Sequence, residues 1–186
     1  MKKAIVTITT IVFIISIVGA VFAAEVDTKL LNWTANTQIA KFGMDKGIVK
    51  AVKAQDKKML SLSYIKDTDR VWRGILGDNT IAIQDDLMSN DCAQAAKALM
   101  ASHPYVTEIF VMDDQGANVC MTTKTGDYWQ GDEAKFWNSY NGGVGAVFVD
   151  DVEEDGGKMI SQVSVPVMSK GKAIGAMTVG VDVDKL

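Results

Sequence analysis

The spacing of apolar residues changes once along this sequence, near Tyr105, and that change limits the folds open to the chain. Before Tyr105 apolar side chains recur at helical spacing, and the clearest run is Leu31, Ala35, Ile39 and Phe42. After Tyr105 they follow the shorter period of β-strands, interrupted by turns that contain glycine. A chain that is helical first and β-rich afterwards is typical of an α+β domain. At 186 residues it is long enough for one such domain with a sizeable core.

The first half predicts a long N-terminal helix followed by shorter helices. Apolar spacing favours a helix from Asp27 to about Lys66, interrupted by Gly43 and Gly47. Each glycine costs a helix about 1 kcal/mol relative to alanine, so we expect a bend or a close contact there. Residues 67–89 predict a short helix, a turn and another short segment. N-capping residues then precede a helix from about Asp91 to Ser102.

The second half predicts five antiparallel strands, with the helices covering one face of the sheet. A turn at Asp113–Gly116 joins the first two strands, because its glycine accepts a positive φ at little cost. Direct pairing across that turn sets Ile109 opposite Cys120 and Phe110 opposite Val119. The expected strands are Val106–Met112, Ala117–Thr122, Gly145–Val149, Met159–Met168 and Ala173–Val183.

Four aromatic rings lie close together in the stretch Asp127–Trp137, which reads DYWQGDEAKFW. The stretch lies between the two groups of strands, so we expect it to cross the sheet. Rings that exclude water, beside a few charges that orient a ligand, are typical of a small-molecule pocket. The alternative interpretation is a loop whose rings only fill the core.

The first two dozen residues are typical of a secretory signal peptide. Lys2 and Lys3 precede the almost wholly apolar residues 4–22, and small residues precede a cleavage site after Ala23. We therefore expect residues 1–23 to be removed and residues 24–186 to form a single periplasmic or otherwise extracytoplasmic domain. The alternative is an uncleaved anchor in the inner membrane, residues 4–24, because the run approaches the length that spans a bilayer.

Composition and motifs argue against several function classes. The formal net charge is −4 and the sequence has no basic stripe, which argues against binding nucleic acid. His103 is the only histidine, and we expect no enzyme because no Ser/His/Asp set can be assembled without it. We expect neither a cofactor nor a metal site, and we interpret the acidic run Asp150–Gly157 as a solvated hairpin turn in preference to a calcium site. Cys92 and Cys120 could form a disulfide, which the sequence neither requires nor excludes.

Three segments together resemble the extracytoplasmic Cache domains, also called PDC sensor domains, which are PAS-like ligand-binding modules of bacterial receptors. They are SHPYVTEIFVMDDQGANV (Ser102–Val119), the stretch Asp127–Trp137, and VSVPVMSKGKAIGAMTVGVDVDKL (Val163–Leu186). With the N-terminal helix, the likeness covers nearly all of the chain after the signal peptide, in the single-module form. It implies a PAS-like sheet of five antiparallel strands and a ligand pocket between that sheet and the loops after the second strand.

One amino-acid-sensing branch of the family holds the ligand carboxylate with an arginine and a tryptophan in the aromatic segment, and the amino group with an aspartate on the following strand. By this resemblance Lys135 and Trp137 fall near the first two positions, and Asp150 or Asp151 near the third. The arginine is absent here, and a lysine offers a point charge without the bidentate geometry of arginine. The predicted ligand-binding residues are Tyr128, Trp129, Lys135, Trp137 and Asp150.

The resemblance predicts a sensor module that binds a small molecule, with a carboxylate or an amine as ligand. In receptors of the family a transmembrane helix and a signalling module follow this domain, whereas this sequence ends at Leu186. We therefore expect a module without its own transmembrane output that signals through a membrane receptor. The alternative is a protein-interaction module of the cell envelope that binds no small ligand and pairs with itself or a receptor through its N-terminal helix.

Overall fold

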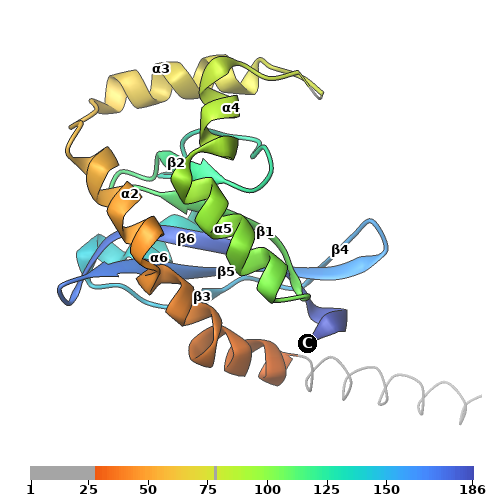
Figure 1. The fold of residues 1–186 in the computed structure, drawn as a ribbon. Coiled ribbons are helices and arrows are strands. Elements are labelled where there is room, and N and C mark those ends of the chain that lie inside the picture. Colours follow the sequence, from red (N-terminus) through yellow and green to blue (C-terminus); the bar gives the residue numbers. More distant parts are fainter. Residues whose placement is uncertain (1–27, 78) are drawn as a thin grey trace, which may run out of the picture.

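The computed structural model of the chain describes residues 28–77 and 79–186 (Figure 1). The predicted signal peptide lies outside the described residues. Among the described residues no helix is both long and apolar enough to span a bilayer. After helical residues 28–37, the elements are η1 (Ile39–Met44), α2 (Lys46–Asp56), α3 (Leu62–Arg73), α4 (Ala82–Ser89), α5 (Asp91–Ser102), β1 (Val106–Met112), β2 (Asn118–Met121), α6 (Ala134–Tyr140), η2 (Asn141–Gly143), β3 (Phe148–Val149), β4 (Glu153–Asp155), β5 (Lys158–Ser169), β6 (Lys172–Asp182) and η3 (Val183–Lys185).

The N-terminal helical region is present and bends at the predicted glycines. Residues 28–37 are helical, η1 follows, and α2 begins after Asp45, whose side chain accepts hydrogen bonds from the N–H groups of Gly47 and Ile48. A Cβ at Gly43 would collide with the carbonyl oxygen of Pro166, so glycine allows η1 to lie directly against β5. The helix does not continue to Lys66 as the spacing predicted, because α2 ends at Asp56 and α3 starts separately at Leu62.

The sheet confirms the predicted antiparallel arrangement. Its strand order is β2-β1-β6-β5-β3, and all the pairs are antiparallel. Among the described residues the sheet has one strand more than predicted, because residues 153–155 form β4 and pair with the start of β5. The β4–β5 turn contains Gly156 and Gly157, both at positive φ, as a tight hairpin turn requires.

The register of the first hairpin differs from the prediction by two residues. Phe110 pairs with Met121 and Val111 with Cys120, where direct pairing across the turn had set Phe110 opposite Val119. The loop is one residue longer than expected, and a bulge between Val111 and Met112 adds the second residue. A shift of two keeps each side chain on its predicted face, because side chains alternate with a period of two.

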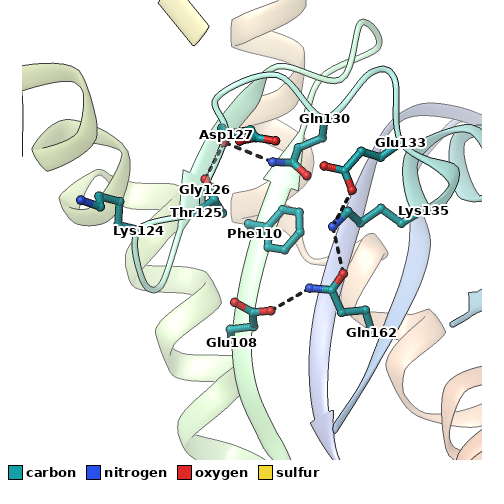
Figure 2. Close-up of a pocket in the computed structure, with 10 residues that line it drawn as sticks. All are labelled: Glu108, Phe110, Lys124, Thr125, Gly126, Asp127, Gln130, Glu133, Lys135 and Gln162. Carbon is teal, nitrogen blue, oxygen red and sulfur yellow. Dashed lines mark hydrogen bonds and ion pairs between the residues drawn. The ribbon is translucent and has the colours of Figure 1, made fainter. Parts of the chain in front are cut away.

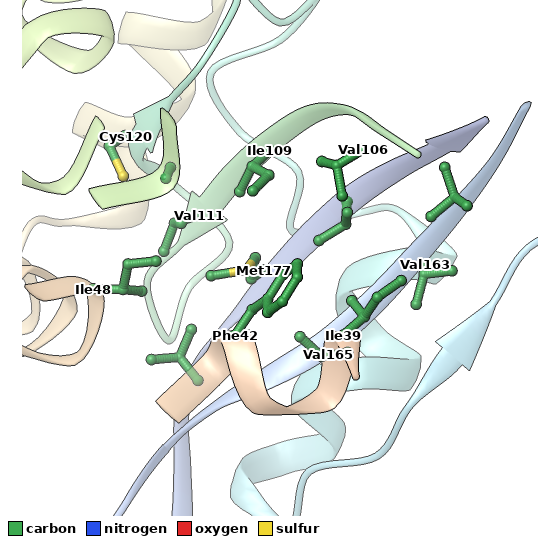
Figure 3. Packing of buried hydrophobic residues seen from close by; sticks show 14 of the residues in the cluster. Ile39, Phe42, Ile48, Val106, Ile109, Val111, Cys120, Val163, Val165 and Met177 are labelled. Atoms are coloured by element: carbon green, nitrogen blue, oxygen red, sulfur yellow. The ribbon is translucent and has the colours of Figure 1, made fainter. Parts of the chain in front are cut away.

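The sheet carries one hydrophobic cluster on each face. On one face Ile109 and Val111 of β1 pack with residues of α2, α5, β5 and β6 (Figure 3). The neighbouring β1 residues Phe110 and Met112 belong to a second cluster. That second cluster also contains Trp72, Tyr128 and Phe136. Both faces of β1 are therefore buried against other elements, which explains its almost continuous apolar sequence.

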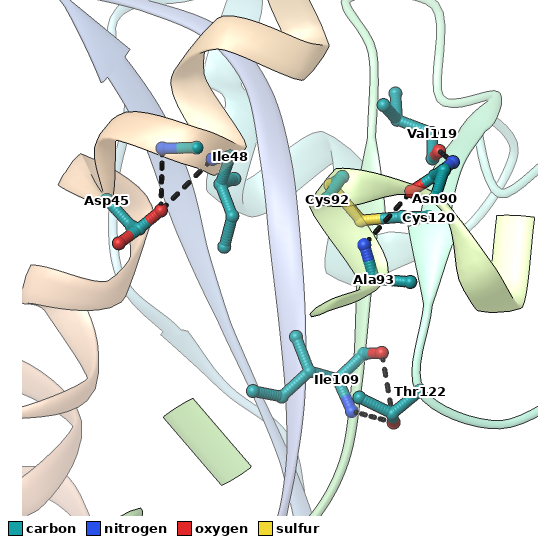
Figure 4. The surroundings of a disulfide bond; sticks show 10 residues. Asp45, Ile48, Asn90, Cys92, Ala93, Ile109, Val119, Cys120 and Thr122 are labelled. Atoms are coloured by element: carbon teal, nitrogen blue, oxygen red, sulfur yellow. Dashed lines mark hydrogen bonds between the residues drawn. A yellow bond between two sulfur atoms is a disulfide. The ribbon is translucent and has the colours of Figure 1, made fainter. Parts of the chain in front are cut away.

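A disulfide joins the start of α5 to β2 (Figure 4). Cys92 and Cys120 have their Cα atoms 5.7 Å apart and are separated by 28 residues in sequence. Beside them Asn90 caps α5 by accepting from the N–H of Ala93, and its amide donates to the carbonyl oxygen of Val119. Closing a loop of this length contributes about 3 to 4 kcal/mol to the free energy of unfolding. The structure thus decides a pairing that the sequence left open.

Candidate ligand-binding site

Residues 122–147 cross the sheet from β2 at one edge to β3 at the other, as predicted for the aromatic stretch. Two side chains of α3 hold the start of this crossing segment. The buried carboxylate of Asp69 accepts hydrogen bonds from the N–H groups of Tyr128 and Trp129, at 2.9 and 3.1 Å. The indole of Trp72 donates to the carbonyl oxygen of Thr125 at 2.9 Å. Helix α3 therefore holds the start of the crossing segment in place.

A cavity of about 300 Å³ lies between this loop and the face of β1 and β5 that carries Glu108, Phe110 and Gln162 (Figure 2). We call this face the outer face of the sheet and the face that carries Ile109 and Val111 the inner face. That volume equals roughly ten water molecules at ~30 Å³ each, so it suits a small metabolite. We call it the β1 pocket. Its lining residues are Glu108, Phe110, Lys124, Thr125, Gly126, Asp127, Gln130, Glu133, Lys135 and Gln162.

A chain of hydrogen bonds runs along one side of the β1 pocket (Figure 2). Lys135 Nζ lies 2.9 Å from Glu133 Oε2 and donates to Gln162 Oε1 at 2.9 Å. Gln162 Nε2 in turn donates to Glu108 Oε1 at 3.0 Å. The Lys135 ammonium also lies 5.4 Å from the centroid of the Phe110 ring. Since its partners surround it, this lysine is held in one place by contacts within the protein.

Gln130 contributes a buried acceptor that lacks a partner. Its Nε2 donates to the carbonyl oxygen of Asp127 at 3.1 Å, while its Oε1 has no hydrogen-bond partner. Exchanging the two amide atoms would place oxygen against the Asp127 carbonyl, so the hydrogen bond decides the orientation. A buried acceptor without a partner costs about 1 to 3 kcal/mol.

Acidic groups outnumber basic ones where the β1 pocket is open to a ligand. Glu108, Asp127 and Glu133 line it, and burial raises the pKa of Asp127, an effect that Arg73 opposes. Lys124 also lies at the rim, but its ammonium donates to the carbonyl oxygens of Gly77 and Asn79 and points away from Phe110 in Figure 2. The pocket therefore offers more acceptors than unoccupied donors.

Of the five residues predicted from the sequence, Lys135 lines the β1 pocket. Tyr128 is buried in the second hydrophobic cluster, where its ring lies 5.6 Å from the ring of Trp72. Trp129 donates from its indole to the carbonyl oxygen of Gln115, and Lys66 lies over its ring. Neither of these two aromatic side chains lines this cavity.

The other two predicted residues lie further from the β1 pocket. The side chain of Trp137 is 58 % exposed and contacts the ring of Phe136. Asp150 is exposed and lines an adjoining acidic hollow beside β4, which shares Glu108 and Gln162 with the β1 pocket. The structure therefore does not bring Trp137 and Asp150 together with Lys135 in this cavity.

Sequence reasoning missed Glu108, Gln130 and Gln162. The signal for Glu108 and Gln162 was a polar residue inside an apolar strand, as in VTEIFVM and ISQVSV. Such a residue indicates the face that is not packed on helices, but it does not tell which strands are neighbours. Gln130 lay within the named aromatic stretch, where the rings drew the prediction away from it.

No protein-family model and no curated protein sequence matches the chain. Among solved structures it is similar to the sensor domain of the Vibrio cholerae histidine kinase DctB, with 12 % identity and a TM-score of 0.47, over 91 % of this chain and 57 % of that one. It is also similar to the sensory domain of a Campylobacter jejuni chemoreceptor with isoleucine bound. The identity is 14 % and the TM-score 0.37, over 84 % of this chain and 62 % of that one.

A third similar structure is the ligand-binding domain of the Pseudomonas aeruginosa amino acid chemoreceptor PctC in complex with GABA. It shares 14 % identity at a TM-score of 0.40, over 73 % of this chain and 57 % of that one. The chain thus spans less than two thirds of the length of each of these three domains. The first two are sensor domains of a histidine kinase and a chemoreceptor, and the third is a chemoreceptor ligand-binding domain.

Proposed function

We propose that the chain is an extracytoplasmic sensor module that binds a small ammonium compound in the β1 pocket and signals through a membrane partner. The observation that carries this proposal is a cavity lined by three carboxylates, with the unpartnered Oε1 of Gln130 buried in its wall. An ammonium group supplies N–H donors and a positive charge, which match those acceptors.

The state of Lys135 argues for an amine over a simple carboxylate. Its ammonium already contacts Glu133 and Gln162, so only one of its three N–H groups is left for an anionic ligand. An anion would also lie near Glu108 and Asp127, which would repel it. We assign Lys135 the role of holding Glu133 and Gln162 in place, which leaves the second carboxylate oxygen of Glu133 for the ligand. A zwitterion such as an amino acid fits if its ammonium group enters first.

A thermal-shift series with matched pairs tests the proposal on protein purified after expression of the complete sequence. Each primary amine is compared with the carboxylate of the same carbon skeleton, for example propylamine with propionate, and with the amino acid that carries both groups. At a concentration about a hundred times Kd, a ligand that binds only the folded state raises Tm by about 5 to 10 °C. We expect shifts from amines or amino acids and none from simple carboxylates.

Two variants connect the response to the pocket. Gln130→Met removes the unpartnered acceptor, and we expect it to reduce the amine-dependent shift to below about 1 °C. Trp137→Ala is the control, because this exposed side chain lies outside the cavity, and we expect the shift to persist. Shifts from carboxylates alone, or an unchanged response in Gln130→Met, would contradict the proposal.

One observation favours a second function, a protein-interaction module. Leu30 and Trp33 are 40 % and 56 % exposed on helical residues 28–37. Large apolar side chains on one exposed helix are typical of a surface that contacts a partner. Two results together would favour this function over the sensor. The natural chain would capture a membrane protein that the double variant Leu30→Glu, Trp33→Glu does not capture, and no tested ligand would shift Tm.

A further inference from the structure

A basic groove runs between α2 and the β5–β6 turn. It encloses about 740 Å³, and its floor is formed by the apolar parts of Met44, Val49, Ala54 and Met168. Lysines of α2 follow one side at helical spacing, and the turn supplies a fifth from the other side. The lysines of this groove are Lys46, Lys50, Lys53, Lys57 and Lys170, all exposed.

The opposite charge is concentrated at the other end of β5. Residues 150–155, which we call the acidic tongue, include β4 and the chain just before it. The tongue carries five exposed carboxylates, namely Asp150, Asp151, Glu153, Glu154 and Asp155. Met159, which pairs with Glu154 next to the β4–β5 turn, is 40 % exposed. The tongue thus combines acidic groups with an exposed apolar side chain.

Neither set of charges is neutralised within the described part of the chain. The ion pairs of residues 28–77 and 79–186 involve none of the five groove lysines and none of the five tongue carboxylates. The tongue cannot reach the groove of its own chain, because the 12 residues of β5 separate them. At ~3.3 Å per residue this strand spans about 40 Å. Figure 1 shows the β4 hairpin and the β5–β6 turn at opposite ends of the sheet.

We propose that the basic groove of one chain binds the acidic tongue of a second copy. The occupant is identified by complementarity, because five lysines around an apolar floor face five carboxylates beside an exposed methionine. The groove and the tongue lie at opposite ends of strand β5. When two copies lie side by side with their β5 strands antiparallel, each groove therefore faces the tongue of the other copy, and the contact forms twice. Such a pair closes on a two-fold axis and does not extend into a filament. The net charge of −4 opposes the other anionic occupant, a membrane of anionic lipids.

Sedimentation velocity on the purified full-length product tests this association. We expect a dimer at about 20 mM salt. At about 500 mM salt we expect the dissociation constant to be at least tenfold larger, because salt screens exposed charges. Two charge-reversed chains are then compared. One carries Lys46→Glu, Lys50→Glu and Lys53→Glu, and the other carries Asp151→Lys, Glu153→Lys and Glu154→Lys. Each is expected to be a monomer alone, with a Tm close to that of the natural chain because all six residues are exposed.

Mixing the two reversed chains gives the decisive result. The acidic groove of the groove-reversed chain then meets the basic tongue of the tongue-reversed chain. The two unchanged surfaces, the basic groove and the acidic tongue, also meet. We therefore expect the dimer to return. A chain that carries both reversals keeps the natural net charge and is expected to dimerise alone. A monomer at every salt concentration, a dimer insensitive to salt and to the reversals, or binding to anionic vesicles without self-association would overturn the proposal.

Discussion

The two faces of β1 differ in what they contact, and the difference separates stability from recognition. On the inner face Ile109 and Val111 belong to an apolar cluster with the helices. On the outer face Glu108 and Phe110 line a pocket with charged and amide side chains. One strand of seven residues thus serves the core and the candidate site at once. Substitutions on the inner face should change the free energy of unfolding, and substitution of the polar Glu108 on the outer face should change ligand response.

The largest effect is expected from Ile109→Ala on the inner face. Ile109 is 1 % exposed, and truncating a buried isoleucine to alanine lowers the free energy of unfolding by about 2 to 5 kcal/mol. Urea unfolding measures this loss. Below its Tm the variant should keep its amine response, and Glu108→Gln is the matched change on the outer face. A stability loss in Glu108→Gln as large as that in Ile109→Ala would break the distinction between the faces.

Removing the disulfide should have the next largest effect. Cys92→Ala with Cys120→Ala deletes the bond between α5 and β2, and we expect about 2 to 4 kcal/mol lower stability in urea. The bond lies on the inner side, in the cluster that contains Ile109. The ligand-dependent Tm shift should therefore be preserved. Loss of the shift in a folded double variant would show that the two faces are coupled.

Asp69→Ala should affect both properties, because Asp69 holds the crossing segment from α3. Removing its carboxylate leaves the N–H groups of Tyr128 and Trp129 without their acceptor. We expect about 1 to 3 kcal/mol lower stability and a weaker ligand response in calorimetric titration. The control is Asp67→Ala, an exposed residue of the same helix that pairs with Arg70 and should change stability by about 0.5 kcal/mol or less. Equal effects of the two variants would contradict this role.

Much of the inner face could be predicted from the sequence. The apolar spacing of Leu31, Ala35 and Ile39 predicted a buried helix face, and all three are fully buried. Strand β1 was predicted with its observed ends. Local patterns suffice for such elements because burial of one face sets the period of apolar residues.

The outer face was harder to predict because it depends on which strands are neighbours. Glu108 and Gln162 are 54 residues apart and meet only because β6 lies between β1 and β5. Strand alternation places a side chain on a face but does not order the strands laterally. Lys135 was named because it lies in the aromatic stretch, whereas the buried Asp69 carries no local signal that it binds residues 59 and 60 positions away.

The smallest expected effect is a pH dependence of stability that originates where α2 meets the β1–β2 turn. Burial and the charge of Asp114 raise the pKa of Asp56 to about 7, and burial raises the pKa of Asp113 to about 6. In the unfolded chain both carboxyls lose their proton near pH 3.8. The folded state therefore binds more protons between these values, and its added stability is complete at low pH and lost as pH rises through 6 to 7.

Thermal unfolding measured from pH 5 to pH 8 checks this sign. We expect Tm to fall with rising pH from these two groups, and Asp56→Asn to reduce the fall by about 2 °C or more. Neither Asp56 nor Asp113 lines the β1 pocket, so the response to an amine at fixed pH should be unchanged in the variant. A steeper fall of Tm with pH in Asp56→Asn would contradict the assignment.

The most direct test of the central claim is an NMR titration that follows side-chain amide signals as an amine is added. The amides of Gln130 and Gln162 line the β1 pocket, and the amide of Asn90 binds Val119 beside the disulfide on the other side of the sheet. Each signal can be assigned by its loss in Gln130→Met, Gln162→Met or Asn90→Asp. We predict saturable shifts for Gln130 and Gln162 and none for Asn90. Shifts at Asn90 with Gln130 unmoved would contradict a ligand site on the outer face of β1.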